Sequence, residues 1–101
     1  MKYEMLVALD VTDATKYARY REAMTPILTR YRGAFRYDFE VSRTLRSEVD
    51  HRINRVFTIS FADEAARDGF FADPAYKVVR EQFFTGSVNA MVVIAEYWTK
   101  D

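Results

Sequence analysis

Two short, uninterrupted apolar runs near the ends of the chain constrain its fold more than any other feature. Residues 5–9 (MLVAL) and residues 90–95 (AMVVIA) are bounded by polar residues and are too short to form helices of their own. Each run predicts a β-strand with both faces buried, over residues 2–10 and 88–98. The chain between them must supply the rest of a sheet and the helices that cover it.

Between these strands the spacing of apolar residues changes from that of a helix to that of a strand. After a capping Thr12 or Asp13, apolar residues recur at steps of three and four up to residue 32, which predicts an amphipathic helix ended by the permissive backbone of Gly33. Alternation over residues 34–43 and 53–62 predicts two antiparallel strands joined by the polar segment 44–52. In the first of them, one face would carry Phe35, Tyr37, Phe39 and Val41, and the other Arg36, Asp38, Glu40 and Ser42.

A second helical segment contains two stop signals. Asp63 can cap it, the Asp73–Pro74 pair breaks it, and Gly86 ends it. The resulting order of strand, helix, strand, strand, helix, strand is that of the ferredoxin-like βαββαβ sandwich, an α+β fold with an antiparallel sheet. Right-handed crossovers place both helices on one face and leave the second and fourth strands at the edges. A chain of 101 residues has the size of a single domain, over residues 1–101.

Composition excludes several classes of function. The chain has no cysteine and one histidine, His51, which excludes thiolate or multi-histidine metal centres and cysteine nucleophiles, so we expect no metal and no cofactor. Fifteen Lys and Arg balance fifteen Asp and Glu, which disfavours nucleic acid as a partner. No run approaches the roughly 20 apolar residues of a membrane-spanning helix, and no signal-peptide pattern is present, so we expect a cytoplasmic protein without a membrane partner.

The predicted fourth strand gives the first functional inference. It lies at a sheet edge and is apolar on both faces, and an uncovered apolar edge is an aggregation site. A second copy of the chain is the simplest cover, so we expect an obligate homodimer with this strand in or beside the interface. If the polar face of the second strand also meets another sheet, its charged residues would form an interface network with Thr58 and Ser60.

Two segments resemble a known family. The residues TDATKYARYREAMTPILTRYRGAF and INRVFTISFADEAARDGFFADPAYKVV, with the Tyr17 and Tyr20 pair, the Gly33 turn and the Phe71-to-Tyr76 segment FADPAY, are similar to the DUF1330 family of small bacterial proteins. That family belongs to the dimeric α+β barrel superfamily. The resemblance implies a homodimer whose two sheets close into a barrel with the helices outside, and it supplies no assigned reaction.

A candidate binding site follows from the distribution of aromatic residues. Tyrosines on the first helix face rings from the strands, and more rings cluster where the second helix breaks. This layer is either solid core or the wall of a small apolar cavity with hydroxyl groups at one end. The candidate ligand-binding residues are Tyr17, Tyr20, Tyr37, His51, Arg55, Phe71 and Tyr76.

Two of these residues have competing interpretations. Arg55 occupies an apolar-face position, where it needs a carboxylate from Glu40 or Glu96, the interpretation that we favour, or from a substrate. His51 lies in the polar segment, where it is a surface residue or a general base. The function predicted is the binding of a small organic molecule. The alternatives are a non-catalytic homodimeric structural or stress-related module and a cofactor-independent enzyme of the monooxygenase or isomerase type, because the superfamily contains such enzymes.

Overall fold

The computed structural model describes residues 1–100 and confirms the predicted order of elements. Each strand lies within three residues of its predicted bounds, and the second helical segment is divided at Pro74 as predicted. The last part of that segment is a short π-helix. The elements are β1 (Tyr3–Val11), α1 (Ala14–Arg30), β2 (Ala34–Glu40), β3 (Arg55–Phe61), α2 (Glu64–Ala72), α3 (Pro74–Val79), the π-helix η1 (Arg80–Phe84) and β4 (Val88–Trp98).

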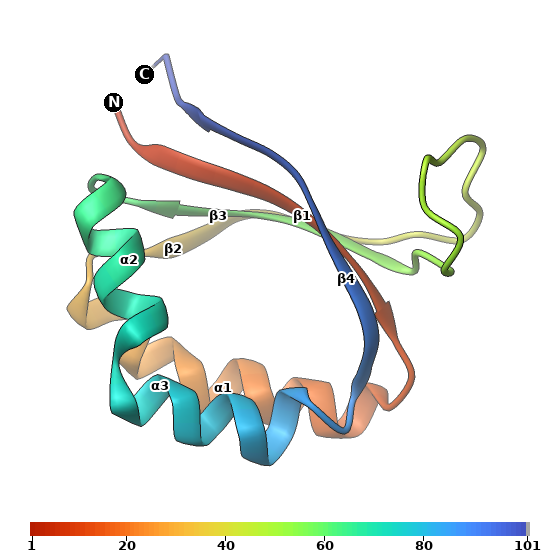
Figure 1. Cartoon of the computed structure of the whole chain (residues 1–101), viewed down its shortest axis with the longest axis horizontal. Coiled ribbons are helices and arrows are strands. Elements are labelled where there is room, and N and C mark those ends of the chain that lie inside the picture. Colours follow the sequence, from red (N-terminus) through yellow and green to blue (C-terminus); the bar gives the residue numbers. More distant parts are fainter. Residues whose placement is uncertain (101) are drawn as a thin grey trace.

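The four strands form one antiparallel sheet in the order β2-β3-β1-β4. All helices cover the same face of this sheet, and the other face is left without a helix (Figure 1). The two ends of the chain lie side by side, where the Thr99 amide donates to the Lys2 carbonyl over 2.8 Å. The predicted ferredoxin-like α+β fold is therefore confirmed, with β1 and β3 in the centre and β2 and β4 at the edges.

Aspartate side chains begin each of the three α-helices. Asp13 accepts a hydrogen bond from the Lys16 amide, Asp63 from the Ala66 amide and Asp73 from the Ala75 amide. These bonds satisfy backbone donors that have no partner inside the helix. Thr12, the alternative cap of α1, instead donates to the Ser87 carbonyl over 3.3 Å and ties the start of α1 to the start of β4.

The end of α1 differs from the prediction. The left-handed backbone conformation lies at Arg32, with a φ of 54°, and Gly33 has a negative or extended φ. Gly33 is needed for a different reason, because a Cβ atom there would lie 2.3 Å from Leu28 Cδ1 and 3.2 Å from the Ser60 carbonyl oxygen. The glycine therefore allows the chain to pass close to α1 and β3 as it enters β2.

A β-bulge in β2 overturns the predicted faces of that strand. Phe35 pairs with Ile59, but Tyr37 pairs with the next residue, Thr58, so Arg36 is an extra residue in the strand. An extra residue shifts every later side chain to the opposite face. Tyr37 and Phe39 consequently lie on the open face, while Asp38 and Glu40 lie on the helix-covered face. The sequence alternates regularly through the bulge and gives no sign of it.

The connection between β2 and β3 packs back on the end of β1. The Asn54 side chain both donates to and accepts from the Val11 backbone over 2.8 Å, and Arg52 Nε donates to Asp10 over 2.9 Å. The rest of the connection projects beyond the sheet (Figure 1). Within residues 1–100, no helix has the length and apolar character needed to cross a membrane.

Candidate functional site

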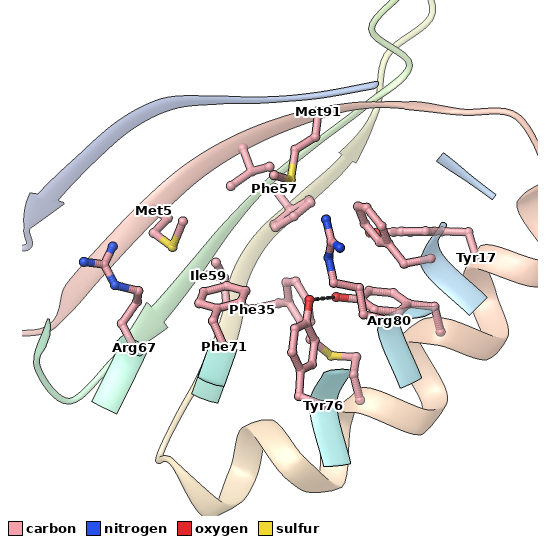
Figure 2. A pocket seen from close by; sticks show the side chains of 14 residues that line it. Met5, Tyr17, Phe35, Phe57, Ile59, Arg67, Phe71, Tyr76, Arg80 and Met91 are labelled. Atoms are coloured by element: carbon pink, nitrogen blue, oxygen red, sulfur yellow. Dashed lines mark hydrogen bonds between the residues drawn. The ribbon is translucent and has the colours of Figure 1, made fainter. Parts of the chain in front are cut away.

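A cavity of about 320 Å³ lies between the helices and the covered face of the sheet. Strands β1, β2, β3 and β4 supply one wall, α1 a second, and α2, α3 and η1 the third, as Figure 2 shows. Apolar and aromatic side chains dominate the lining: Met5, Val7, Met24, Phe35, Phe57, Ile59, Phe71, Phe84 and Met91. Such a lining, with few polar groups, is typical of sites that bind small molecules.

The tyrosines of α1 and α3 supply the innermost polar group of the cavity. The hydroxyls of Tyr20 and Tyr76 lie 2.8 Å apart and form a buried hydrogen bond (Figure 2). Burial raises the pKa of both hydroxyls above the ordinary value of a tyrosine. Both side chains therefore keep their hydrogens at neutral pH, and the pair acts as a neutral hydrogen-bonding group.

A charged cluster lies beside the cavity at Tyr17. Asp38 accepts hydrogen bonds from Arg55 over 2.8 and 2.9 Å and from Arg21 over 3.1 and 3.3 Å. The Arg21 guanidinium also donates to the Tyr17 hydroxyl over 2.8 Å and lies 3.8 Å from the centre of the Phe35 ring. The hydrogen bonds from Arg55, followed by those from Arg21, hold the pKa of Asp38 below its usual range.

Arg55 forms an ion pair within the protein, but with neither of the two predicted partners. The structural ion pair that we favoured is present, but its carboxylate belongs to Asp38, and neither Glu40 nor Glu96 supplies it. The bulge at Arg36 is the reason, because it turns Asp38 toward the helices and into reach of Arg55. Glu96 binds Arg67 instead.

Four of the seven predicted site residues line the cavity: Tyr17, Tyr20, Phe71 and Tyr76. The other three do not. Tyr37 lies on the open face because of the bulge and is 56% exposed. Arg55 lies outside the cavity, with its guanidinium 5.3 Å from the Tyr17 ring. His51 lies in the connection between β2 and β3, where its Nδ1 contacts the Arg52 carbonyl at 3.0 Å.

Two further arginines line the cavity, and neither is among the residues predicted from the sequence. Arg67 on α2 binds Asp68 and Glu96 and lies 5.0 Å from the centre of the Tyr3 ring. Arg80 begins η1 and lies 5.2 Å from the centre of the Phe84 ring. The spacing in the sequence could have indicated Arg80. It follows Tyr76 by four residues, and this spacing places two side chains on the same face of a helix.

The mouth of the cavity lies between η1 and β4. Arg80 and Met91 both line the cavity, yet both are exposed, and Met91 is 49% exposed. Figure 2 shows the Arg80 side chain passing over the Tyr20–Tyr76 pair toward the sheet. A molecule that enters here would meet the arginine, the two hydroxyls and the aromatic walls together. Among residues 1–100, no three His, Asp or Glu side chains gather in a way that could hold a metal ion.

Comparison with solved structures shows the fold clearly. A protein of unknown function from Rhodopseudomonas palustris superposes with a TM-score of 0.82, at 18% identity, over 99% of this chain and 83% of its own. A dabb family protein with a ferredoxin-like fold from Mesorhizobium loti gives a TM-score of 0.66 at 18% identity, over 99% of this chain and 98% of its own.

A third similar structure is described as dimeric. This ferredoxin-like protein of unknown function from Jannaschia sp. CCS1 gives a TM-score of 0.63 at 20% identity, over 98% of this chain and 100% of its own. No curated protein matches the sequence. A family model does match residues 3–97, and its description is "Domain of unknown function (DUF1330)".

Proposed function

The chain belongs to the DUF1330 family, and we propose that it binds a small, largely apolar organic molecule in the cavity between its helices and its sheet. The cavity itself carries this proposal. Protein interiors pack so densely that voids much larger than a water molecule are few, whereas this cavity of about 320 Å³ lies within the range of roughly 300–1,000 Å³ that is common for ligand sites.

The groups that line the cavity favour binding over catalysis. Tyr20 and Tyr76 keep their hydrogens, so they are suited to donating hydrogen bonds and poorly suited to removing a proton. The only histidine lies outside the cavity. The enzymatic alternative would need a base or a nucleophile at the cavity wall, and the arrangement of the lining side chains offers none within the described part of the chain.

A thermal-shift screen against small phenols, quinones, lactones and carboxylic acids tests the binding proposal. A ligand at a hundred times its dissociation constant stabilises a fold by about 2.7 kcal/mol. The matched variants are Val7→Phe, which adds a ring at a buried residue of the cavity wall, and Val78→Phe, which adds the same ring at a residue that is 63% exposed on α3.

We expect Val7→Phe to abolish the ligand-induced shift and Val78→Phe to preserve it. Binding in some other place would leave the shift intact in both variants. If no compound in the screen raises the melting temperature of the wild-type protein, the proposal fails.

We also propose that the chain forms a homodimer. The edge strand β4 leaves Val93, Ile94 and Trp98 exposed by 37, 54 and 46%, and exposed apolar groups of this kind mark association surfaces. On the open face of the sheet, the stacked rings of Tyr37 and Phe39 are 56 and 55% exposed. Two proteins of similar structure, from Jannaschia sp. CCS1 and Bacteroides fragilis, are described as dimeric.

Light scattering coupled to size-exclusion chromatography at micromolar concentration tests the dimer. The wild-type protein should elute with twice the mass of the chain. Ile94→Asp should give an insoluble or unfolded protein, because it places a charge where the partner would cover it. Val78→Asp, on an exposed part of α3, should remain a folded dimer. A stable wild-type monomer would contradict the proposal.

A further inference from the structure

The polar end of the cavity consists of hydrogen-bond donors. A phenol has one hydrogen to donate, and the Tyr20–Tyr76 hydrogen bond uses only one of the two that the pair carries, whichever tyrosine is the donor. The second hydrogen is available to a molecule in the cavity. Burial keeps both hydroxyls protonated, so the pair can always offer this donor.

Arg80 adds a positive charge at the same place. Its guanidinium is near enough to the Tyr76 hydroxyl to lower that group's pKa, although the opposing effect of burial is larger. Figure 2 shows its side chain reaching across the Tyr20–Tyr76 hydrogen bond. The Arg80 side chain and the hydroxyl pair therefore lie together in one part of the cavity lining.

Arg80 differs from the other arginines around the cavity in lacking a carboxylate partner. Arg21 and Arg55 share Asp38, and Arg67 binds Glu96 and Asp68. Within residues 1–100, no Asp or Glu oxygen lies within ion-pair distance of Arg80, whose contacts are with the ring of Phe84 and the hydroxyl of Tyr76. The cavity lining thus contains one positive charge that the protein itself does not neutralise.

The π-helical turn is the local structure that begins at this arginine. The Thr85 amide bonds to the Arg80 carbonyl over 3.1 Å, five residues back, so η1 is wider than an α-helix. Turns of this kind are rare and occur often at functional sites. Arg80 is the first residue of this turn and Phe84 is its last. Both line the cavity, as does Tyr76, which precedes the turn.

On the premise that the cavity is the binding site proposed above, we infer that its ligand is a small aromatic carboxylic acid whose carboxylate pairs with Arg80 and accepts the spare hydrogen of the Tyr20–Tyr76 pair. A carboxylate is an acceptor with no hydrogen to donate, which complements a site that offers only donors there. Phe57, Phe71 and Met24 supply the apolar surface for the ring. A cavity of about 320 Å³ limits that ring system to one or two fused rings.

Calorimetric titration with matched pairs of acids and amides tests this inference. The probes are benzoate against benzamide and 2-naphthoate against 2-naphthamide, which share a ring and differ in charge. Hydrogen bonds to charged groups contribute about 1.5–3 kcal/mol, so the wild-type protein should bind each acid roughly ten- to a hundredfold more tightly than its amide. Arg80→Gln should remove this preference and leave the affinity for the amides within about twofold.

Arg67→Gln is the matched control. It removes the same charge from the same cavity lining, but at an arginine whose charge is already neutralised by Glu96 and Asp68. The preference for acids should persist in this variant. Circular dichroism of both variants checks that they remain folded, and Arg80→Lys, which keeps the charge and loses the planar donor pair, should restore part of the preference.

The outcomes separate this inference from the proposed function. If acids and amides bind equally, or if Arg80→Gln keeps the preference for acids, the inference is overturned while the binding cavity stands. Loss of the preference in Arg67→Gln and not in Arg80→Gln also overturns it. If neither acids nor amides bind, the inference is overturned; if the thermal-shift screen of the wild-type protein also finds no ligand, the proposed function fails with it.

Discussion

The two faces of the sheet carry similar side chains and differ in what covers them. On the helix-covered face, Phe61 and Phe70 are fully buried and belong to a network of ring contacts with centre-to-centre distances of 4.4–6.2 Å. On the open face, Tyr37 and Phe39 stack only on each other and remain more than half exposed. Aromatic composition therefore says little about burial until the covering layer is known.

The polar residues of the two faces differ in a second way. On the open face, Glu4 is buried among its neighbours, where it accepts hydrogen bonds from Tyr97 over 2.5 Å and from Arg36 over 3.5 Å. Burial and the bond to Glu4 raise the pKa of Tyr97 to about 12. On the covered face, by contrast, the Tyr20–Tyr76 pair and Arg80 leave donors directed at a cavity. Glu4 on the open face therefore has its partners within the protein, whereas Arg80 on the covered face lines the cavity without a carboxylate partner among residues 1–100.

Replacing one ring on each face should give the largest difference. Phe70→Ala removes a fully buried ring that contacts Tyr31, Phe61, Phe71 and Tyr76, and we expect it to lower the free energy of unfolding by about 3–5 kcal/mol. Phe39→Ala should lower the free energy of unfolding far less when urea unfolding is measured at low protein concentration. Its effect should grow with concentration if the open face is buried in a dimer. If both variants lost the same free energy of unfolding at every protein concentration, the proposed difference between the two faces would be wrong.

Adding one carbon atom should show how closely the covered face is packed. In Gly33→Ala, the new Cβ would lie 2.3 Å from Leu28 Cδ1, a side chain that is 2% exposed, so we expect a loss of about 1–3 kcal/mol from overpacking. Gly86→Ala is the control, because its Cβ would meet only the end of the flexible Lys16 side chain. That variant should unfold within about 0.5 kcal/mol of the wild-type protein. If Gly86→Ala costs as much as Gly33→Ala, steric contact is not the cause.

Removing the hydroxyls of the tyrosine pair should have a smaller effect. Tyr20→Phe or Tyr76→Phe removes one buried hydrogen bond and leaves one hydroxyl without its partner, which should cost about 1 kcal/mol. The double variant should cost less than the sum of the single losses, because no buried hydroxyl of the pair then remains unpaired. Thermal or urea unfolding of all four proteins measures this coupling. Strict additivity would mean that the two hydroxyls do not depend on each other.

The smallest effect should appear in the acid range. The arginines lower the pKa of Asp38 in the folded protein, so the carboxylate stabilises the fold above its unfolded pKa of about 3.9. This contribution is lost as the pH falls through the lower, folded pKa. The difference in stability between the wild-type protein and Asp38→Asn should therefore be constant above about pH 5 and shrink below about pH 4. If this difference in stability instead grew as the pH fell, the pKa of Asp38 would be raised in the folded protein and not lowered.

The fold could be predicted because its signals are local and repeated. Apolar runs at residues 5–9 and 90–95, helical spacing from Tyr17 to Leu28, and stop signals at Gly33 and Pro74 each predict one element. Their order leaves few topologies. Tyr17, Tyr20, Phe71 and Tyr76 could be placed in the candidate site for the same reason, since their spacing directs them into the layer between helices and sheet.

The rest of the site depends on one extra residue in a strand, which the spacing of apolar residues along the sequence does not reveal. One extra residue at Arg36 moves Tyr37 to the open face and brings Asp38 to Arg55. The alternation of side chains around Arg36 is equally compatible with a regular strand and with a bulged one. Only the pairing of β2 with β3 decides which of the two forms.

The sequence by itself determined the identity and order of the elements, the face of α1 that is buried and the apolar character of β4. These properties follow from residue type and spacing along one element, which short-range physics controls. Only the tertiary structure decided which of the arginines around the cavity has no carboxylate partner, which hydroxyls meet and whether the aromatic layer encloses a cavity. Each of these depends on the distance between side chains from different elements. A difference of a few ångströms in that distance decides whether two charges pair and whether a layer of rings is closed or encloses a cavity.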